Sequence, residues 1–347
     1  MNAKQESGLR FSEDNVLWLG MDELLYLRPP TVINGTLIAE IADRHQEMLD
    51  SPHVYPCERA IRLDPFNNFL IHSVHHRFEV HAQLNPGAGA IKSDRAQLTY
   101  GELDCQADGL AAKLQQAGVG SGHVCVVCMT PSITMVRAVL AILKAGGAYL
   151  LLDPTQEPER MAAMLGKSDS AIVILDGDSS NRLMAPNAKT ILCGESGVDL
   201  PYSWPHEYPT GILSPAYVIA TFTSADSSNF AYITHQSIVG KLAMIQEFSP
   251  ISQGDSLMLN ANCSLSTFAW KCLWPLAYGA QLVIQSTPET NPERMLEFIA
   301  RERIAVMHAE PSLLYLLLAD SHCDGLRSLR ALFCANQRST GTSGTTT

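Results

Sequence analysis

The chain has 347 residues and a formal net charge of −11, and 17% of its residues are charged, against about 25% in a typical soluble domain. Its hydrophobic fraction of 46% supplies ample apolar surface for a core, which excludes disorder over most of the chain. The acidic balance excludes a generic nucleic-acid binder, because phosphate contacts require clustered cations. At about 150 residues per domain, the length predicts roughly two domains.

Cysteine usage and the first residues bear on the cellular compartment. The nine cysteines have irregular spacing. The stretch Asn2–Leu9 is mostly polar, and Arg10 follows it directly. This is not the apolar segment of a secretory signal, so we predict reduced thiols and a cytoplasmic location.

One stretch, Ile133–Leu152, is apolar enough to be mistaken for a membrane span. Arg137, Lys144 and a Gly146-Gly147 pair interrupt it. A buried helix followed by a buried strand is therefore the preferred interpretation, and we predict no membrane partner.

The chain begins with weak signals and then alternates regularly. Residues 1–30 show no clear period, Thr36–Leu49 predicts an amphipathic helix, and Ser51–Phe66 predicts a proline-broken linker. Further helices are predicted at Glu102–Ala117, from a Ser132 cap to about Ala145, and at Glu157–Leu165, His235–Phe248, Thr267–Tyr278, Pro292–Glu302 and Pro311–Ala319. Strands are predicted at His123–Met129, Ala148–Leu152, Ala171–Leu175, Ala216–Thr221, Ser256–Asn260, Gln281–Gln285, Ile304–His308 and Leu329–Cys334.

Continuous apolar strands separated by helices predict an α/β fold whose parallel sheets are covered by helices on both faces. Sheets of this kind place ligands at the carboxyl ends of their strands. The tail Ser339–Thr347 has low complexity, and we predict that it is disordered.

Two short motifs are better explained without chemistry. The glycine-rich run Gly118–Gly122 follows a helix and precedes a strand, which is the reverse of a dinucleotide loop. Cys125 and Cys128 form a CxxC pair, but on a strand they point to opposite faces, and no second pair has matching spacing. We predict that they are buried thiols.

A histidine cluster offers a second metal candidate. His72, His75 and His76 could share one face of a helix, and His81 follows nearby. Because the sequence provides no evident acidic or cysteine partner that would complete a ligand set, we predict no metal site there.

A series of segments in fixed order is more informative. These segments are Leu98–Leu103 (LTYGEL), Leu143–Tyr149 (LKAGGAY), Asp153-Pro154, Pro158–Arg160, Met164-Leu165, Ala216–Ile219 (AYVI), Thr234-His235, Trp274–Leu276 (WPL), Gly279-Ala280, Leu282–Ile284, Pro311–Leu314 (PSLL) and Phe333-Cys334. In this order and spacing they resemble the amino-acid adenylation domains of nonribosomal peptide synthetases, which belong to the adenylate-forming, AMP-binding superfamily.

The resemblance implies a domain division. Residues 1–74 would be a condensation-like tail and linker, because Thr36–Pro52 resembles the last helix of a condensation-type domain. Residues 75–338 would be part of the large N-terminal subdomain of an adenylate-forming enzyme, and residues 339–347 the disordered tail. The family's downstream YGPTE-like segment, ribose-binding aspartate and C-terminal catalytic lysine do not follow Cys334, so we expect a truncated domain.

The resemblance also locates the family's ATP loop, which reads like YTSGSTGxPKG and would cradle a triphosphate through its glycines, hydroxyls and lysine. Without a gap, the vestigial positions of this loop are Thr221, Thr223, Ser224 and Asn229. Every family glycine is replaced, Asn229 stands in place of the lysine, and Asp226 adds a carboxylate. Losing one preorganised donor costs about 100- to 1,000-fold in rate, so we assign no catalytic residue. We expect no bound cofactor, since ATP and Mg are implied by resemblance alone.

The implied amino-acid pocket has changed as well. The family's FDxSxxE-like segment, counted back from Trp274, places its ammonium-binding aspartate on Ser266 and its glutamate on Lys271. A neutral hydroxyl cannot make the charge-assisted hydrogen bond. Ser266 and Trp270 are thus vestigial pocket positions. An acid lacking an α-amine is the alternative substrate, but beside the altered ATP loop we favour sequence drift.

These features predict a remnant of an adenylation domain, whose ancestral activity was ATP-dependent activation of an amino acid for loading onto a carrier protein. We expect no independent catalysis, so whether the chain is an enzyme stays open. The alternatives are a noncatalytic docking or accessory module of a synthetase assembly, or residual adenylate-forming ligase activity. Possible partners are synthetase subunits or a carrier protein.

Overall fold

The computed structural model describes the chain in several ranges. These are residues 16–19, 24–27, 73–168, 170–181, 183, 188–194, 210–224, 227–260, 265–286, 289, 291–309, 313, 317 and 326–334, with side chains except at 16–19, 24–27, 181, 221–224, 227–229, 265, 266 and 334. The chain divides into two compact units, one of residues 62–288 and the other of residues 1–61 and 289–347.

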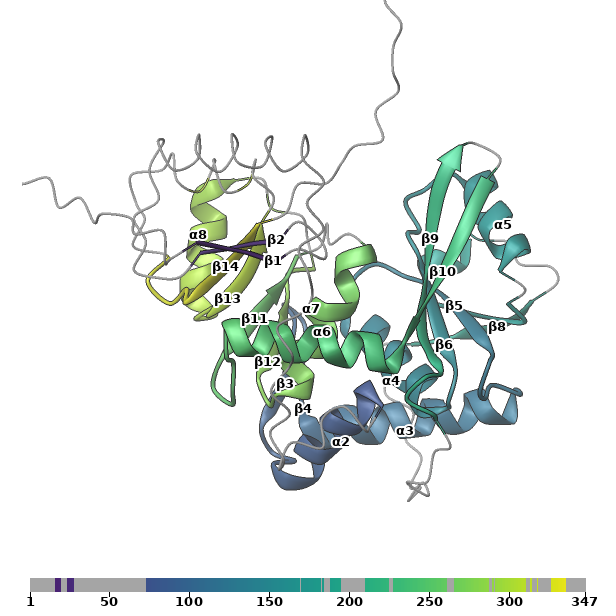
Figure 1. Cartoon of the computed structure of the whole chain (residues 1–347), viewed down its shortest axis with the longest axis horizontal. Coiled ribbons are helices and arrows are strands. Elements are labelled where there is room, and N and C mark those ends of the chain that lie inside the picture. Colours follow the sequence, from purple (N-terminus) through teal and green to yellow (C-terminus); the bar gives the residue numbers. More distant parts are fainter. Residues whose placement is uncertain are drawn as a thin grey trace, which may run out of the picture. The chain divides into compact units, whose positions relative to one another are not determined.

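The unit of residues 62–288 contains a six-stranded sheet (Figure 1). Its strands, in spatial order, are β10 (Ser227–Thr234), β9 (Pro215–Ser224), β6 (Ala148–Leu152), β5 (Val124–Cys128), β7 (Ile172–Leu175) and β8 (Lys189–Leu192). Neighbours are parallel throughout, except that β10 runs antiparallel to β9. All five residues of β6 are buried, as expected for a parallel strand covered on both faces.

Capping residues explain where the helices of this unit begin. The helices are α2 (Val74–Leu84), α3 (Tyr100–Gln116), α4 (Ile133–Lys144), α5 (Pro158–Lys167), α6 (His235–Phe248) and α7 (Leu265–Ala277), with a short 3-10 turn, η3, at Ser179–Asn181. Thr99 and Glu102 form a reciprocal capping box at α3, and the hydroxyls of Ser132 and Thr234 cap α4 and α6. Each cap satisfies a backbone N–H that the helix leaves unpaired.

The same unit contributes four further strands in the order β11 (Ser256–Leu259), β12 (Gln281–Ile284), β3 (Gly89–Lys92) and β4 (Gln97–Thr99). The first three are parallel, and β4 returns antiparallel to β3. α7 packs against β11, β12 and α2, while α2 also contacts α3, α4 and α6. Helix α2 thus contacts helices that pack on each of the two groups of strands in this unit.

The second unit is smaller in its described part. It contains α8 (Pro292–Arg301), the parallel strands β13 (Val306–Ala309) and β14 (Ala331–Cys334), and the hairpin of β1 (Val16–Leu19) and β2 (Leu24–Leu27). β2 pairs antiparallel with β14, so the amino-terminal hairpin extends the β13–β14 sheet. The Asn291 side chain caps α8 by accepting from Glu293 N and Arg294 N.

The α/β fold and most elements predicted from the sequence are confirmed. For α6 and β6, the first and last residues are those predicted. Cys125 and Cys128 are buried on β5, and burial raises the pKa of both thiols to about 12. Ile133–Leu152 forms a buried helix and strand as expected. Among the described residues, no helix is long and apolar enough to cross a membrane.

Several elements were missed. No element was predicted for residues 1–30, which contain β1 and β2, and helix α2 and the strands β3, β4, β8 and β10 were also not predicted. These strands are mostly three or four residues long, and a short strand shows too few alternations to be recognised. The predicted helix Thr36–Leu49, the linker and the tail lie outside the described residues, as does Pro311–Ala319 apart from Leu313 and Leu317.

Gly279 provides a test of how α7 joins β12. Its φ of +77° favours glycine, and an added Cβ would lie 2.9 Å from Nδ1 of His81 on α2. We expect Gly279→Ala to lower the free energy of unfolding by more than about 1 kcal/mol, because strain and crowding add. Gly166→Ala, on α5 with nothing near its added Cβ, is the control and should be neutral or slightly stabilising. Denaturant unfolding measures both, and equal effects would contradict the account.

Candidate functional site

The predicted ATP-loop positions lie on a β-hairpin rather than an irregular loop. Thr221, Thr223 and Ser224 belong to β9, and Asn229 belongs to β10. The ladder places Thr221 opposite Asn229 and Ser224 opposite Ser227. The structure therefore brings the backbones of Thr221 and Asn229 together, whereas the side chains of all four predicted positions lie outside the described ones.

This segment does not fit a triphosphate with its magnesium ion. An antiparallel ladder directs every second backbone N–H of β9 and β10 toward the neighbouring strand. From residue 221 to residue 230 there is neither a glycine nor a lysine. Glycine is what allows a backbone to approach phosphate oxygens closely, and lysine supplies the compensating charge. The glycines and the lysine of a phosphate-binding loop are therefore absent from residues 221–230.

Helix α7 carries the two predicted pocket positions. Ser266 and Trp270 are one turn apart, a spacing that places residues on the same helical face. Trp270 is fully buried, with its ring 6.2 Å from that of Trp274. Trp274 Nε1 donates to Gln246 Oε1 of α6 over 2.8 Å. Lys271, which aligns with the family's glutamate, is also buried. The pocket role of Ser266 and Trp270 remains a prediction.

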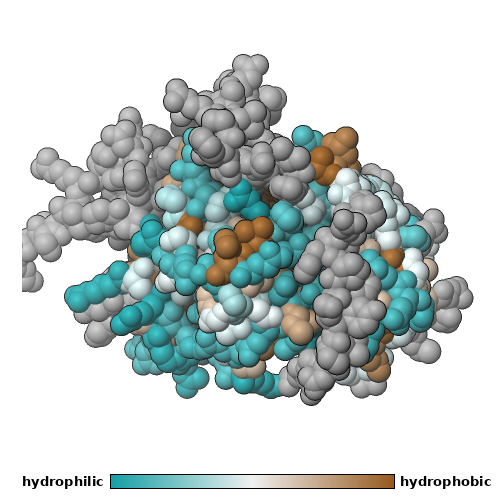
Figure 2. Space-filling model, turned by 90° about the horizontal axis from the view of Figure 1, so that it is seen from below, coloured by the Kyte–Doolittle hydropathy of each residue, from teal (hydrophilic) through white to brown (hydrophobic). Residues whose placement is uncertain are grey.

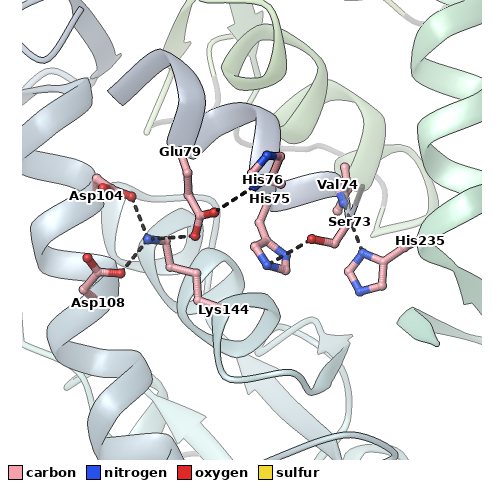
Figure 3. A network of polar contacts seen from close by, with 9 residues as sticks. All are labelled: Ser73, Val74, His75, His76, Glu79, Asp104, Asp108, Lys144 and His235. Atoms are coloured by element: carbon pink, nitrogen blue, oxygen red, sulfur yellow. Dashed lines mark hydrogen bonds and ion pairs between the residues drawn. The ribbon is translucent and has the colours of Figure 1, made fainter. Parts of the chain in front are cut away.

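His235 connects the hairpin to the helices. It is the first residue of α6, directly after β10, and its N–H donates to Ser214 O over 3.0 Å. Val74 N of α2 donates to His235 Nδ1 over 3.2 Å (Figure 3). An Nδ1 that accepts is unprotonated, so the neutral ring carries its proton on Nε2. Burial lowers the pKa of His235 to about 4.

His75 lies beside His235 and shares its environment. The two ring centroids are 5.7 Å apart in an edge-on arrangement, and Ser73 Oγ is 3.1 Å from His75 Nε2. Burial, followed by the charges that His235 and Lys144 would carry, lowers the pKa of His75 well below its ordinary value. Both imidazoles are therefore held neutral.

A buried ion cluster joins α2, α3 and α4, and it was not predicted from the sequence (Figure 3). Lys144 Nζ of α4 lies 3.2 Å from Glu79 Oε1 of α2, 2.6 Å from Asp104 Oδ1 and 2.5 Å from Asp108 Oδ1 of α3. The lysine is completely buried. A sequence signal was present, because Asp104 and Asp108 are four residues apart on one helical face and Lys144 ends an apolar helix.

The charges of this cluster explain its pKa values. Burial alone would lower the pKa of Lys144, but Asp104, Glu79 and Asp108 outweigh it and raise that pKa. Burial raises the pKa of Glu79, and Lys144 only partly offsets this. The lysine is therefore charged, and its single positive charge is shared among three carboxylates.

The histidines of α2 have an acidic neighbour that sequence analysis did not identify. His76 Nδ1 lies 3.6 Å from Glu79 Oε2, one turn along α2. His81 lies against Gly279, and His72 falls outside the described residues. Within the described part of the chain, no three histidine, cysteine or acidic side chains are arranged to hold a metal ion.

Comparison with known proteins defines the class to which the chain belongs. The chain matches the AMP-binding enzyme family over residues 78–206 and 230–343 and belongs to that family. The match is interrupted at residues 207–229, which include all four predicted ATP-loop positions.

Its relatives narrow the class to nonribosomal peptide synthetases and their adenylation domains. The chain is 30% identical to tyrocidine synthase 3 of Brevibacillus parabrevis over 267 residues, covering 76% of this chain and 4% of that protein. It is 28% identical to malpinin synthetase of Mortierella alpina over 292 residues, covering 81% of this chain and 4% of that protein. The chain thus spans only a small part of these relatives.

Solved structures agree on the fold. The nonribosomal peptide synthetase FmoA3, crystallised with AMPPNP bound, superposes with a TM-score of 0.68 at 25% identity, covering 75% of this chain and 28% of that chain. The N-terminal subdomain of Klebsiella oxytoca NpsA superposes with a TM-score of 0.62 at 19% identity, covering 75% of this chain and 66% of that chain. The fold is that of the N-terminal subdomain of adenylate-forming enzymes.

The ion cluster generates a stability prediction. Lys144→Met removes the ammonium group that lies against Glu79, Asp104 and Asp108, and it leaves the buried Glu79 carboxylate without that charge. We expect a loss of about 3–5 kcal/mol in the free energy of unfolding at neutral pH. Lys113→Met on the exposed side of α3 is the matched control and should stay within about 0.5 kcal/mol. Guanidinium unfolding measures both, and a loss at Lys144 no larger than at Lys113 would show that the cluster is not stabilising.

His235 generates a pH prediction. Its pKa falls from an ordinary 6.5 to about 4 on folding, so the unfolded chain takes up the proton first as the pH falls. This contribution to stability is complete above pH 6.5 and is lost between pH 6.5 and 4, at about 1.4 kcal/mol per pH unit.

Denaturant unfolding at several pH values compares the chain with His235→Asn, whose amide oxygen can still accept from Val74 N. The variant should lose the corresponding slope between pH 6.5 and 4. Gln236→Asn, at the exposed neighbouring position, should retain it. An unchanged slope in His235→Asn would refute the assignment.

Proposed function

We propose that this chain carries the adenylation-domain fold of a nonribosomal peptide synthetase but does not itself form aminoacyl adenylates. In this proposal it is a remnant of an ancestral ATP-dependent amino-acid-activating domain. The observation that carries the proposal is the β9–β10 ladder, which contains the positions predicted for the ATP loop and has no glycine or lysine between residues 221 and 230.

The electrostatics of the hairpin support this proposal. The aligned lysine position is Asn229, and Asp226 is the charged residue within residues 221–230. A carboxylate beside a triphosphate is repulsive, and no local cation in this segment offsets it. The family match is interrupted at residues 207–229, a range that includes all four predicted ATP-loop positions, and this agrees with the proposal.

In this proposal, the chain is part of a synthetase assembly. The relatives are long synthetases of which the chain spans 4%, so synthetase subunits or a carrier protein are the proposed partners, in the cytoplasm. We further propose the division into residues 1–74 as condensation-like tail and linker, 75–338 as partial adenylation subdomain and 339–347 as tail. A noncatalytic docking role within the assembly is the second candidate, and residual ligase activity is the third.

The test is ATP–pyrophosphate exchange by the purified chain with each of the twenty amino acids, together with unfolding measurements with and without ATP and magnesium. We expect no amino-acid-dependent exchange and no stabilisation by ATP. A ligand at about 100 times its Kd would raise the free energy of unfolding by about 2.7 kcal/mol, which is readily detected.

Two variants of the hairpin serve as a matched pair. One restores the family chemistry with Thr223→Gly, Asp226→Gly, Asn229→Lys and Phe230→Gly, and the other places alanine at the same four positions. Gain of ATP stabilisation in the restored variant alone would identify the missing glycines and lysine as the cause. Amino-acid-dependent exchange by the unaltered chain would overturn the proposal and favour residual ligase activity.

A further inference from the structure

Strand β10 forms one edge of the six-stranded sheet. It is the terminal strand in the order β10-β9-β6-β5-β7-β8, and no other described strand pairs with its outer side. Its register with β9 is regular between the irregularities at Ser227/Ser228 and Ile233/Thr234. An edge of this kind directs every second N–H and C=O away from the sheet, where another strand can pair with them.

Between the irregularities at its two ends, this edge lacks the features that usually prevent pairing. Residues 227–234 include no charged residue and no proline. The opposite edge, β8, has four residues and begins with Lys189. Short length and an edge lysine are common protection against strand addition. The two edges of the sheet therefore differ, and β10 is the open one.

The apolar face of the sheet continues to this edge. Val218 lies in the buried core cluster, and Ala220 and Phe230 pack against that cluster. Tyr232 is paired with Val218, which places it on the same face, yet it is 56% exposed. On the face shown in Figure 2, apolar residues lie in small groups among hydrophilic ones. The other large exposed apolar side chains of the described chain are Leu84, Leu192 and Leu213.

Beyond Val218, the hairpin of β9 and β10 lacks the strand pairing that β6 provides to the first part of β9. β6 pairs with β9 at Tyr217 and Val218, so the residues beyond Val218 are held in register by β10 alone among the described strands (Figure 1). A two-stranded ribbon is marginally stable in water, and an additional strand stabilises it.

We propose that β10 pairs antiparallel with β10 of a second copy of this chain, about a two-fold axis at Ala231, and so joins two six-stranded sheets. This register places Phe230 opposite Tyr232 of the second copy, twice by symmetry, and aromatic cross-strand pairs stabilise a sheet. Because the strand carries no charge, pairing with itself brings no like charges together. The contact is isologous and closes at a dimer, and it does not depend on the proposed loss of adenylation.

Sedimentation of the full chain over about a hundredfold concentration range tests the pairing, because a self-association shifts with concentration by mass action. We expect a reversible monomer–dimer equilibrium. Tyr232→Lys should weaken the dimer at least about tenfold, since it removes the aromatic pair and adds an edge charge in both copies. Leu192→Lys, at the β8 edge of the same sheet, is the matched control and should leave the dimer unchanged.

A cross-link tests the register and does not depend on the lysine variants. Ala231 is exposed, and in a Cys105→Ser background Ala231→Cys should form a disulfide-linked dimer under mild oxidation, whereas Leu192→Cys should not. A chain that is monomeric at every concentration would overturn the proposal, including the case in which β10 pairs with a foreign strand. A dimer that is insensitive to Tyr232→Lys, or lost in Leu192→Lys, would overturn it as well.

Discussion

The ammonium group of Lys144 is completely buried, and three carboxylates from two other helices surround it. A charge removed from water in this way is tolerable only when its partners are held in place. The cluster consequently fixes α2 against α3 and α4. From the start of α2, Val74 N reaches His235, and His235 directly follows β10. Helix α2 thus links the hairpin to the charge cluster, because Glu79 and Val74 both lie on it.

In this family member, the fold does not require the glycines and the lysine of a phosphate-binding loop. The residues that cap helices, fill parallel strands and neutralise Lys144 are all present, and they belong to segments outside residues 221–230. Those ten positions contain no glycine and no lysine, and the fold around them is formed. Function in such folds is located in a few site residues rather than in the architecture, and this chain retains the architecture.

Local sequence signals account for the elements that could be predicted. Thr99 with Glu102, Ser132 and Thr234 mark helix starts, and the apolar run Ala148–Leu152 marks a buried strand. Strand β10 could not be predicted, because Ser227–Asn229 has no apolar alternation and the strand exists through its register with β9. The Lys144 cluster was missed for a related reason: Glu79, Asp104 and Lys144 meet only after three helices pack. The predicted ATP-loop positions followed from the family resemblance, but their extended conformation on β9 and β10 did not.

The order of strands in the six-stranded sheet has a kinetic consequence. β9 and β10 are separated by two residues, whereas β9 meets β6 only after the segment 153–214 has closed. Closure of a short loop takes about 10–100 ns, and longer separations carry a larger entropic cost. The pairing of β9 with β10 therefore has the lowest entropic cost in this sheet. The hairpin can form before β9 pairs with β6. Docking of a preformed ribbon onto β6 is then a late, non-local step in the folding of this domain.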